Sequence, residues 1–256
     1  MYIDTHTHLY SESFDEDREE MIDRAKQNSI THFMLPAIDS TYTHAMWDLK
    51  KKHPNSMHIM AGLHPTHVKP KTIDFELQHI REQLNLHQHC AIGEIGIDLY
   101  WDTSTKEIQK EVFAKQIQWA KDYDLPIVIH CRDAFKEVFE VLEKENNERL
   151  RGIFHCFTGT KEDALRALDF NLKLGIGGVS TFKNGKIDLF LNEIDLEHIV
   201  LETDAPYLAP TPYRGKRNES SYLIKIAEKL AEIYQTDLSK IAEITTKNAK
   251  NIFNLN

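Results

Sequence analysis

The sequence contains little cysteine and no long hydrophobic run, and each absence excludes a class of protein. Only three cysteines occur, Cys90, Cys131 and Cys156, and no two of them form a CxxC pair. A zinc knuckle or a disulfide framework is therefore not expected, and we expect each thiol to pack as a small apolar side chain. No run of about 18 apolar residues is present, which argues against a transmembrane helix.

The chain also lacks low-complexity segments, short-period repeats and an excess of positive charge. It has 31 Lys and Arg residues against 40 Asp and Glu residues, a net charge of −9. An acidic surface disfavours nonspecific binding of nucleic acid over the whole molecule, although a bound cation or one basic loop can still supply a local positive field. No basic segment followed by an apolar one stands at the N-terminus. These features predict a cytoplasmic protein with no membrane association and no obligate protein partner.

Short apolar runs alternate with longer amphipathic stretches, and this alternation predicts the fold. Each run is bounded by turn signals, as in buried parallel strands. A doubly wound sheet would have a glycine-rich phosphate loop after its first strand, and none is present. A chain of 256 residues instead fits one α/β domain over residues 1–256, a (β/α)8 TIM barrel with an extra C-terminal helix. The predicted strands are 2–9, 31–38, 58–63, 90–97, 126–131, 151–157, 172–178 and 198–203, and the predicted helices are 15–28, 41–52, 73–86, 106–123, 133–145, 160–169, 186–194, 219–234 and 237–253.

Several predicted strands end in histidine or carboxylate side chains. In a β/α barrel the C-terminal ends of all strands meet at one rim, where catalytic groups gather. Nitrogen and carboxylate ligands without thiolates suit Zn, Mn, Fe or Mg, and residue type alone does not choose among them. Six such side chains exceed the needs of one tetrahedral ion, so two divalent cations are expected. The predicted ligands are His6, His8, Glu94, His130, His155 and Asp204.

The neighbours of these positions receive separate interpretations. Glu94 lies within an apolar strand, where a carboxylate is costly unless it is paired or bound to metal. A buried ion pair with Arg132 is the structural alternative for Glu94. Asp4 and Glu202 lie one step deeper than the ligands, on the same strand faces, and are predicted to orient the ligating side chains.

Further residues near the rim are predicted to contact a substrate. His64 ends the third strand without a partner at ligand spacing. The segment 213–217 follows strand eight, and its cations beside a tyrosine can hold a phosphate backbone and stack a base; the alternative is a solvated loop. Tyr100 and Trp101 are further stacking candidates, unless they simply pack. The predicted substrate-binding residues are His64, Arg132, Tyr213, Arg214, Lys216 and Arg217.

Taken together, several motifs in the right order resemble the TatD family of metal-dependent deoxyribonucleases along the full length of the chain. They are YIDTHTHL, GLHP, AIGEIGID, HCRDAF, HCFTG and LETDAPYLAPTPYRGKRNES. The resemblance implies a (β/α)8 barrel and 3′→5′ exonuclease activity on DNA, with single strands preferred. It also implies that His64 contacts the substrate near the scissile phosphate. Two metal sets are implied, with Glu94 bridging them: His6, His8, Glu94 and Asp204 in one, and Glu94, His130 and His155 in the other.

Two positions depart from the family pattern. Ser220 stands where the family usually has proline, and Thr66 stands where its GxHP loop often continues with another histidine. Neither is a predicted ligand, so the expected effect of both departures is on substrate preference.

The predicted reaction is phosphodiester hydrolysis by a water activated between two divalent cations. Asp204, Glu94 and His64 are the predicted catalytic residues: Asp204 orients and deprotonates the water, Glu94 bridges the cations, and His64 stabilises charge on the phosphate oxygens. The alternative is an amidohydrolase-type enzyme acting on a small-molecule ester or amide. Many of those barrels bridge their metals with a modified lysine, and a glutamate at this position favours the nuclease. A metal-binding scaffold without activity is disfavoured because all six ligand types and His64 are present.

Overall fold

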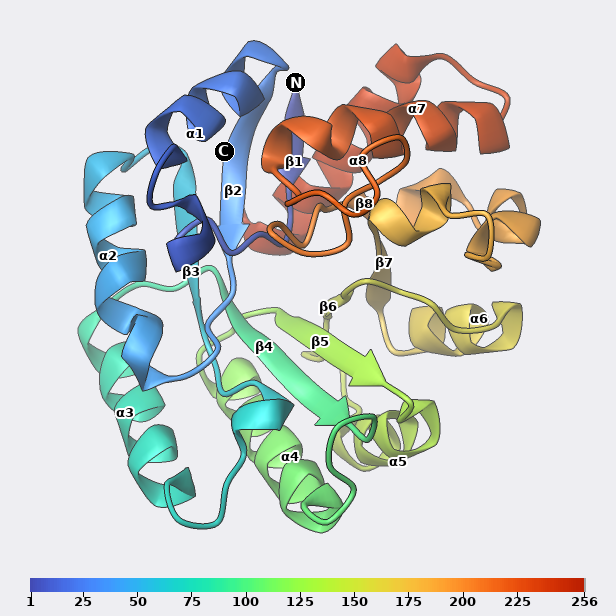
Figure 1. Cartoon of the computed structure of the whole chain (residues 1–256). Helices are drawn as coiled ribbons and strands as arrows, with labels where there is room; N and C mark the ends of the chain where they lie inside the picture. The colour runs from blue at the N-terminus through green and yellow to red at the C-terminus, as the bar shows by residue number, and fades with distance from the viewer. Residues whose placement is uncertain (256) are drawn as a thin grey trace.

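Eight parallel strands form the centre of the molecule in the computed structural model, which describes residues 1–255 (Figure 1). Each strand pairs with the next one along the chain, from first to last. Past the strand ends, the Thr5 N–H donates to Leu201 O at 3.0 Å and the Asp204 N–H donates to His6 O at 2.9 Å, so the first strand lies beside the last. The predicted (β/α)8 barrel is confirmed. The strands are β1 (Tyr2–Asp4), β2 (Ile30–Leu35), β3 (Met57–Ala61), β4 (Ala91–Asp98), β5 (Ile127–Arg132), β6 (Gly152–Phe154), β7 (Leu172–Ile176) and β8 (Ile199–Leu201).

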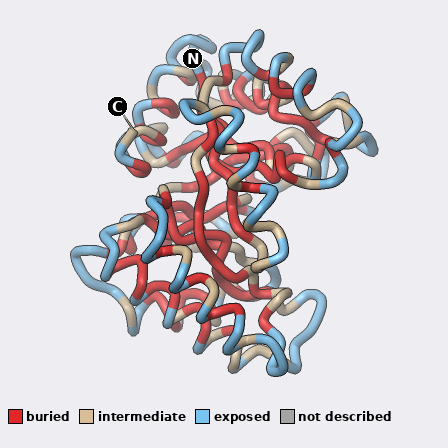
Figure 2. The backbone as a smooth tube through the Cα atoms, turned by 90° about the vertical axis from the view of Figure 1, so that its left-hand side faces the viewer, coloured by how far each residue is buried: buried red, intermediate tan, exposed pale blue. Residues whose placement is uncertain are grey.

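The helices surround the barrel, and the buried backbone runs through the middle of the molecule (Figure 2). Their apolar residues recur at helical spacing and face the strands, which is why periodicity located eight of them. Within residues 1–255, no helix combines the length and the apolar composition that crossing a bilayer requires. The helices are α1 (Arg18–Gln27), α2 (Thr43–Lys52), α3 (Ile73–Leu86), α4 (Lys106–Asp122), α5 (Phe135–Glu145), α6 (Lys161–Asp169), α7 (Leu223–Ile233) and α8 (Leu238–Phe253).

The predicted α-helix over 186–194 is wrong. The segment between β7 and β8 forms two 3-10 turns instead, Ile187–Leu189 and Leu191–Glu193. Ile187, Leu191 and Ile194 are all buried, and their spacing of four and three residues imitates the period of a helix. Phe190, between the turns, has φ −133°, far from helical backbone, so the apolar residues pack without one continuous helix.

The predicted extra C-terminal helix is present as α8. Ala249, Ile252 and Phe253 of this helix join one buried cluster with residues of seven strands. The helix therefore packs its last turns against the apolar interior of the barrel, on strands whose opposite ends carry the polar rim. The strand residues of this cluster are Ile3, Met34, Met60, Ala91, Val128, Ile153 and Val200.

Candidate metal centre

Glu94 lies among the predicted histidine ligands. Its Oε2 is 3.1 Å from Nε2 of His6. Its Oε1 is 2.8 Å from Nδ1 of His130 and 3.8 Å from Nε2 of His155. Burial raises the pKa of Glu94, but His64, His6 and His155 outweigh burial and hold that pKa well below its usual value. Glu94 is thus a buried anion with imidazoles on both oxygens, so the alternative of an ion pair with Arg132 is wrong.

A local irregularity of β4 turns Glu94 into the barrel. Ala91, at the start of the strand, belongs to the interior cluster, and strict alternation from Ala91 would direct Glu94 to the helix layer. The register between β4 and β5 shifts between Gly93 and Ile95. Such a bulge changes which side chains face inward, and Asp98, four residues further along, then shares the side of Glu94.

Asp204 faces the same histidines from the end of β8. Its Oδ1 lies 3.3 Å from Nε2 of His8, and 3.8 Å and 3.9 Å from Nε2 of His6 and His155. His6, His8 and Asp204 present their ligand atoms within 4.8 Å of one another, as do His64, Glu94 and His130. His155 joins His6 and Glu202 in a third such group. The structure therefore brings all six predicted ligands together at the rim.

This donor set fits divalent cations. His6 is completely buried, yet within residues 1–255 neither of its ring nitrogens has a hydrogen-bond partner. Buried polar atoms normally find partners, and a cation would provide one for Nε2. The surroundings also favour positive charge: burial lowers the pKa of His155, but Glu202 and Glu94 raise it to about 10. Imidazole and carboxylate groups without thiolate are suitable ligands for Zn, Mn or Mg.

Tyr10 fixes the proton on His8. The Tyr10 hydroxyl donates to Pro36 O at 2.6 Å and lies 2.8 Å from Nδ1 of His8. A tyrosine hydroxyl has a single proton, so Nδ1 of His8 must be the donor to Tyr10. The lone pair of His8 is then on Nε2, the atom that faces Asp204.

Glu202 contacts His155 from the side opposite the ligand atoms. Its Oε1 lies 2.9 Å from Nδ1 of His155 and accepts a hydrogen bond from the Cys156 N–H at 2.7 Å. The Glu202 carboxylate fits because residue 175 is glycine: a Cβ there would lie 2.3 Å from Oε2. Glu202 thus occupies the position from which the sequence predicts that it orients a ligand.

The prediction for Asp4 needs correction. Strand β1 ends at Asp4 and the chain bends there, while Ile3 belongs to the interior cluster, so Asp4 and His6 do not share one continuous strand face. The Asp4 carboxylate accepts hydrogen bonds from Thr203 Oγ1 and Ser220 Oγ, both at 2.6 Å. Its Oδ1 also accepts from the backbone N–H groups of Thr203, at 2.9 Å, and of His6, at 3.5 Å. Asp4 thus contacts the backbone of a predicted ligand rather than its ring, and Ser220, a departure from the family pattern, is one of its donors.

A cavity of about 630 Å³ opens above the histidines. Among residues 1–255, Arg132 is the one lysine or arginine that lines it. The exposed Arg132 guanidinium lies 3.7 Å over the ring of Tyr100 and 5.5 Å from that of Trp101. Cys131 lines this cavity as well, and so does Cys156, for which the sequence predicted only apolar packing. Its backbone is left-handed, with φ 43°, so strand alternation does not continue to this residue.

His64 lies beside the Glu94 group as a hydrogen-bond donor. Its Nδ1 accepts from the Thr66 N–H at 3.2 Å, so the neutral ring carries its proton on Nε2. That nitrogen is 3.4 Å from Glu94 Oε1 and 3.2 Å from His130 Nδ1. Burial is the largest cause that lowers the pKa of His64, to about 4. At neutral pH His64 is therefore an uncharged donor.

Arg217 is held by partners within the protein. It donates to both carboxylate oxygens of Asp17, at 2.7 and 2.8 Å, and to Ser13 O at 2.8 Å. Its guanidinium also lies 4.6 Å over the ring of Phe14. These contacts use the donors that a phosphate would need, and they conflict with the predicted contact between Arg217 and substrate.

The rest of the segment 213–217 also lies outside the cavity lining. The ring of Tyr213 stacks on Tyr222 with centroids 3.9 Å apart, and the Arg214 guanidinium lies 3.6 Å over Phe182. Lys216 is exposed. Exposed cations of this segment can reach only a part of the substrate that extends beyond the cavity.

Two residues that contact the predicted ligand histidines were not themselves predicted, Asp98 and Tyr10. Asp98 Oδ2 lies 2.8 Å from Nε2 of His130. The signal for Asp98 was present in AIGEIGID, because two carboxylates four residues apart on a strand share a side. Tyr10 gave no such signal, since it lies beyond β1 in irregular backbone.

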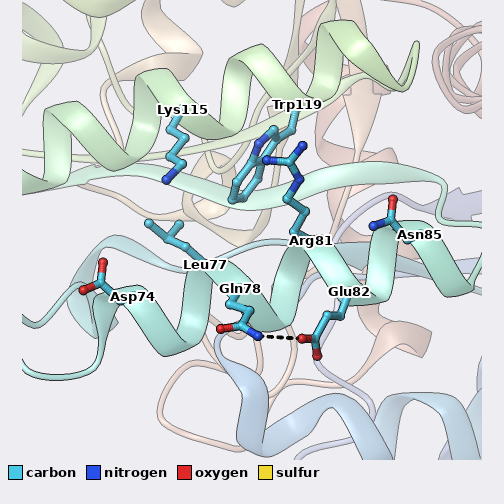
Figure 3. A pocket seen from close by; sticks show the side chains of 8 residues that line it. All are labelled: Asp74, Leu77, Gln78, Arg81, Glu82, Asn85, Lys115 and Trp119. Atoms are coloured by element: carbon cyan, nitrogen blue, oxygen red, sulfur yellow. Dashed lines mark hydrogen bonds between the residues drawn. The ribbon is translucent and has the colours of Figure 1, made fainter.

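A second hollow, of about 360 Å³, lies on the outer surface between α3 and α4 (Figure 3). Lys115 and Trp119 of α4 face six residues of α3 there, and Gln78 donates to Glu82 across one turn at 2.9 Å. None of the predicted site residues lines this hollow.

The barrel and its rim of histidines and carboxylates define a metal-dependent hydrolase. The chain belongs to the TatD related DNase family, whose model matches residues 3–254. It is 42% identical to an uncharacterized metal-dependent hydrolase of Bacillus subtilis, YabD, over 100% of both chains. It is 31% identical to the 3′-5′ ssDNA/RNA exonuclease TatD of Pectobacterium parmentieri, over 98% of this chain and 99% of that protein. Among solved structures, the TatD homologue YJJV of Escherichia coli superposes with TM-score 0.93 at 28% identity, covering 100% of this chain and 98% of that one.

Proposed function

We propose that this protein is a two-metal phosphodiesterase that degrades DNA from its 3′ end and prefers single strands. The observation that carries the proposal is the position of Glu94, with imidazoles facing both of its oxygens. One carboxylate can thereby serve two neighbouring cations, an arrangement suited to hydrolysis at phosphorus. The similarity to a protein named a 3′-5′ ssDNA/RNA exonuclease supports the choice of substrate.

The residues divide into two ligand sets that share Glu94. His6, His8 and Asp204 would complete one set, and His130 and His155 the other. Divalent cations, when bound, lower the pKa of a water and offset negative charge on the phosphate. Each ring presents one nitrogen to the carboxylates, and in His8, His130 and His155 the other nitrogen is held by Tyr10, Asp98 and Glu202.

Asp204 and His64 have complementary tasks. Asp204 lies at the cavity rim with its carboxylate toward the histidines, where it can accept the proton of an attacking water. His64 directs its Nε2–H toward Glu94 from the segment after β3, and this uncharged donor can stabilise a non-bridging phosphate oxygen.

The surface beside the ligands suits a nucleotide. The guanidinium of Arg132 is free of ion pairs among residues 1–255 and rests on the ring of Tyr100. Trp101, which is 70% exposed, also lines the cavity. Flat aromatic faces stack bases of any sequence, and arginine beside them binds the backbone. We assign Arg132 and Trp101 the nearest contacts, and Lys216 and Arg214 contacts with the strand further out.

The test is a degradation assay with single-stranded DNA labelled at its 5′ end. With Mg²⁺ or Mn²⁺ the labelled strand should shorten stepwise, and a chelator should stop the reaction. His130→Ala should lose activity while the fold persists. His44→Ala, which removes a histidine of α2 that is 89% exposed, is the matched control and should remain active. Equal degradation with and without chelator would contradict the proposal, and turnover of lactones or cyclic amides without DNA degradation would favour the amidohydrolase alternative.

A further inference from the structure

Asp98 is a buried carboxylate between a predicted metal ligand and an exposed aromatic turn. It ends β4 and is 2% exposed. Its Oδ2 lies 2.8 Å from Nε2 of His130. Its Oδ1 accepts hydrogen bonds from the N–H groups of Tyr100, at 3.0 Å, and Trp101, at 3.3 Å. One side chain thus contacts both the metal centre and the surface on which Arg132 rests.

The backbone of Asp98 is itself fixed from the helix layer. Gln109 of α4 accepts from the Asp98 N–H at 2.8 Å and donates to Asp98 O at 3.1 Å. Gln109 is buried, so this reciprocal pair is shielded from water. A carboxylate anchored in this way has little freedom to follow a moving imidazole, and it can therefore dictate the orientation of His130.

The two carboxylates around His130 settle which nitrogen can act as a ligand. A neutral imidazole has one N–H and one lone pair. Nδ1 faces Glu94 at 2.8 Å and Nε2 faces Asp98 at 2.8 Å. Coordination beside Glu94 requires the lone pair on Nδ1, so the proton must be on Nε2, where Asp98 accepts its hydrogen bond.

We propose that Asp98 is a positioning residue, which holds His130 as the Nδ1 ligand and ties that orientation to the Tyr100–Trp101 turn. The inference rests on the proposed function, because His130 needs a free Nδ1 only as a metal ligand. Asp98 contacts both His130 and the backbone of the Tyr100–Trp101 turn. A substitution at Asp98 should therefore disturb the metal centre and the aromatic surface together.

The test is Asp98→Asn, which keeps the size of the side chain but offers one acceptor where two are used. If the amide oxygen stays with the two N–H groups of the turn, the amide NH₂ faces Nε2 of His130 and drives its proton to Nδ1. Binding of Mn²⁺ or Zn²⁺ alone to metal-free protein, measured by calorimetry, should weaken about 10- to 100-fold, as for other groups that orient metal ligands.

A carboxylate with closely similar contacts provides the control. Asp39 Oδ2 lies 2.6 Å from Nδ1 of His67, and its Oδ1 accepts from the Thr41 N–H at 2.9 Å. His67 belongs to neither proposed ligand set. Asp39→Asn should therefore leave the metal affinity unchanged, which separates a specific effect on His130 from the general loss of a pair between a carboxylate and an imidazole.

A second measurement determines which nitrogen of His130 carries the proton, and it uses the wild-type protein, so its result does not depend on whether a variant folds. Long-range ¹⁵N–¹H spectra of the zinc-loaded protein should show the His130 proton on Nε2, and a proton on Nδ1 would overturn the inference. Metal affinity of Asp98→Asn within threefold of the wild type would overturn the inference alone. Failure of the wild-type protein to bind any divalent cation would overturn the proposed function as well.

Discussion

Arg217→Ala tests whether the cations after β8 belong to the structure or to the substrate site. Arg217 pairs with Asp17 through two hydrogen bonds, donates to Ser13 O and covers Phe14. Both partners of the ion pair are about one-third exposed, so the pair contributes about 1 kcal/mol or less. The bond to Ser13 adds about 0.5–1 kcal/mol, and the contact with Phe14 adds about 0.5 kcal/mol.

The total cost of this substitution is therefore about 2 kcal/mol. For a chain of this length each 1 kcal/mol lowers Tm by roughly 2–4 °C, so Tm should fall by about 4–8 °C. At a temperature well below Tm, the KM for single-stranded DNA should change less than about twofold, because Arg217 lies outside the cavity lining. Differential scanning calorimetry and initial rates measure the two quantities.

Arg132→Ala is the matched comparison, since it removes a cation that lines the cavity and has no ion pair among the described residues. It should raise KM and leave Tm nearly unchanged, the reverse of Arg217→Ala. A variant at Arg217 with unchanged Tm and a several-fold higher KM would refute the structural role and restore the prediction made from the sequence.

Two further predictions concern stability. Phe253→Ala removes a buried ring of α8 from the barrel interior and should lower the free energy of unfolding by about 3–5 kcal/mol. Lys247→Ala, on the exposed side of the same helix, should change that free energy by less than about 0.5 kcal/mol. Urea titrations compare the two variants, and equal midpoints would contradict the role of α8. Burial lowers the pKa of His89 from 6.5 to about 4, so the unfolded state binds more protons in that interval and stability should fall as pH drops from about 6.5 to about 4. His89→Leu should flatten this pH dependence, and an unchanged slope in unfolding experiments would count against it.

The clustering of the histidines at the rim could be predicted from the sequence because the fold itself brings them together. The C-terminal ends of parallel strands meet at one rim, so His130 and His155 needed only correct strand positions. Both histidines lie at the predicted rim, although β6 ends at Phe154, one residue before His155 and three before the predicted end of that strand at residue 157. Histidine and carboxylate residues at the ends of apolar runs were a sufficient signal.

Residue contacts that depend on irregular backbone or on distant segments could not be predicted in the same way. Asp4 was misplaced because β1 ends at that residue, and the alternation of side chains ends with it. The partner of Arg217 is Asp17, 200 residues away in the sequence, and local sequence patterns cannot predict an ion pair between residues so far apart. The sequence analysis grouped Glu94 with the histidines, as the structure does, although the bulge that turns Glu94 inward cannot be recognised from the alternation of residues.

In the proposed function, the charges of the cavity determine how an acidic protein would attract a polyanion. Three carboxylates, of Glu94, Asp98 and Asp204, line the cavity, against a single guanidinium, that of Arg132. Without cations such a surface repels a phosphate backbone, and the net charge of −9 adds to the repulsion. Two divalent cations on the shared carboxylate would reverse the sign of the local field. In the proposed function, attraction of DNA and activation of water therefore depend on the same ligands, and the aromatic turn anchored by Asp98 adds the contact with bases that charge alone does not provide.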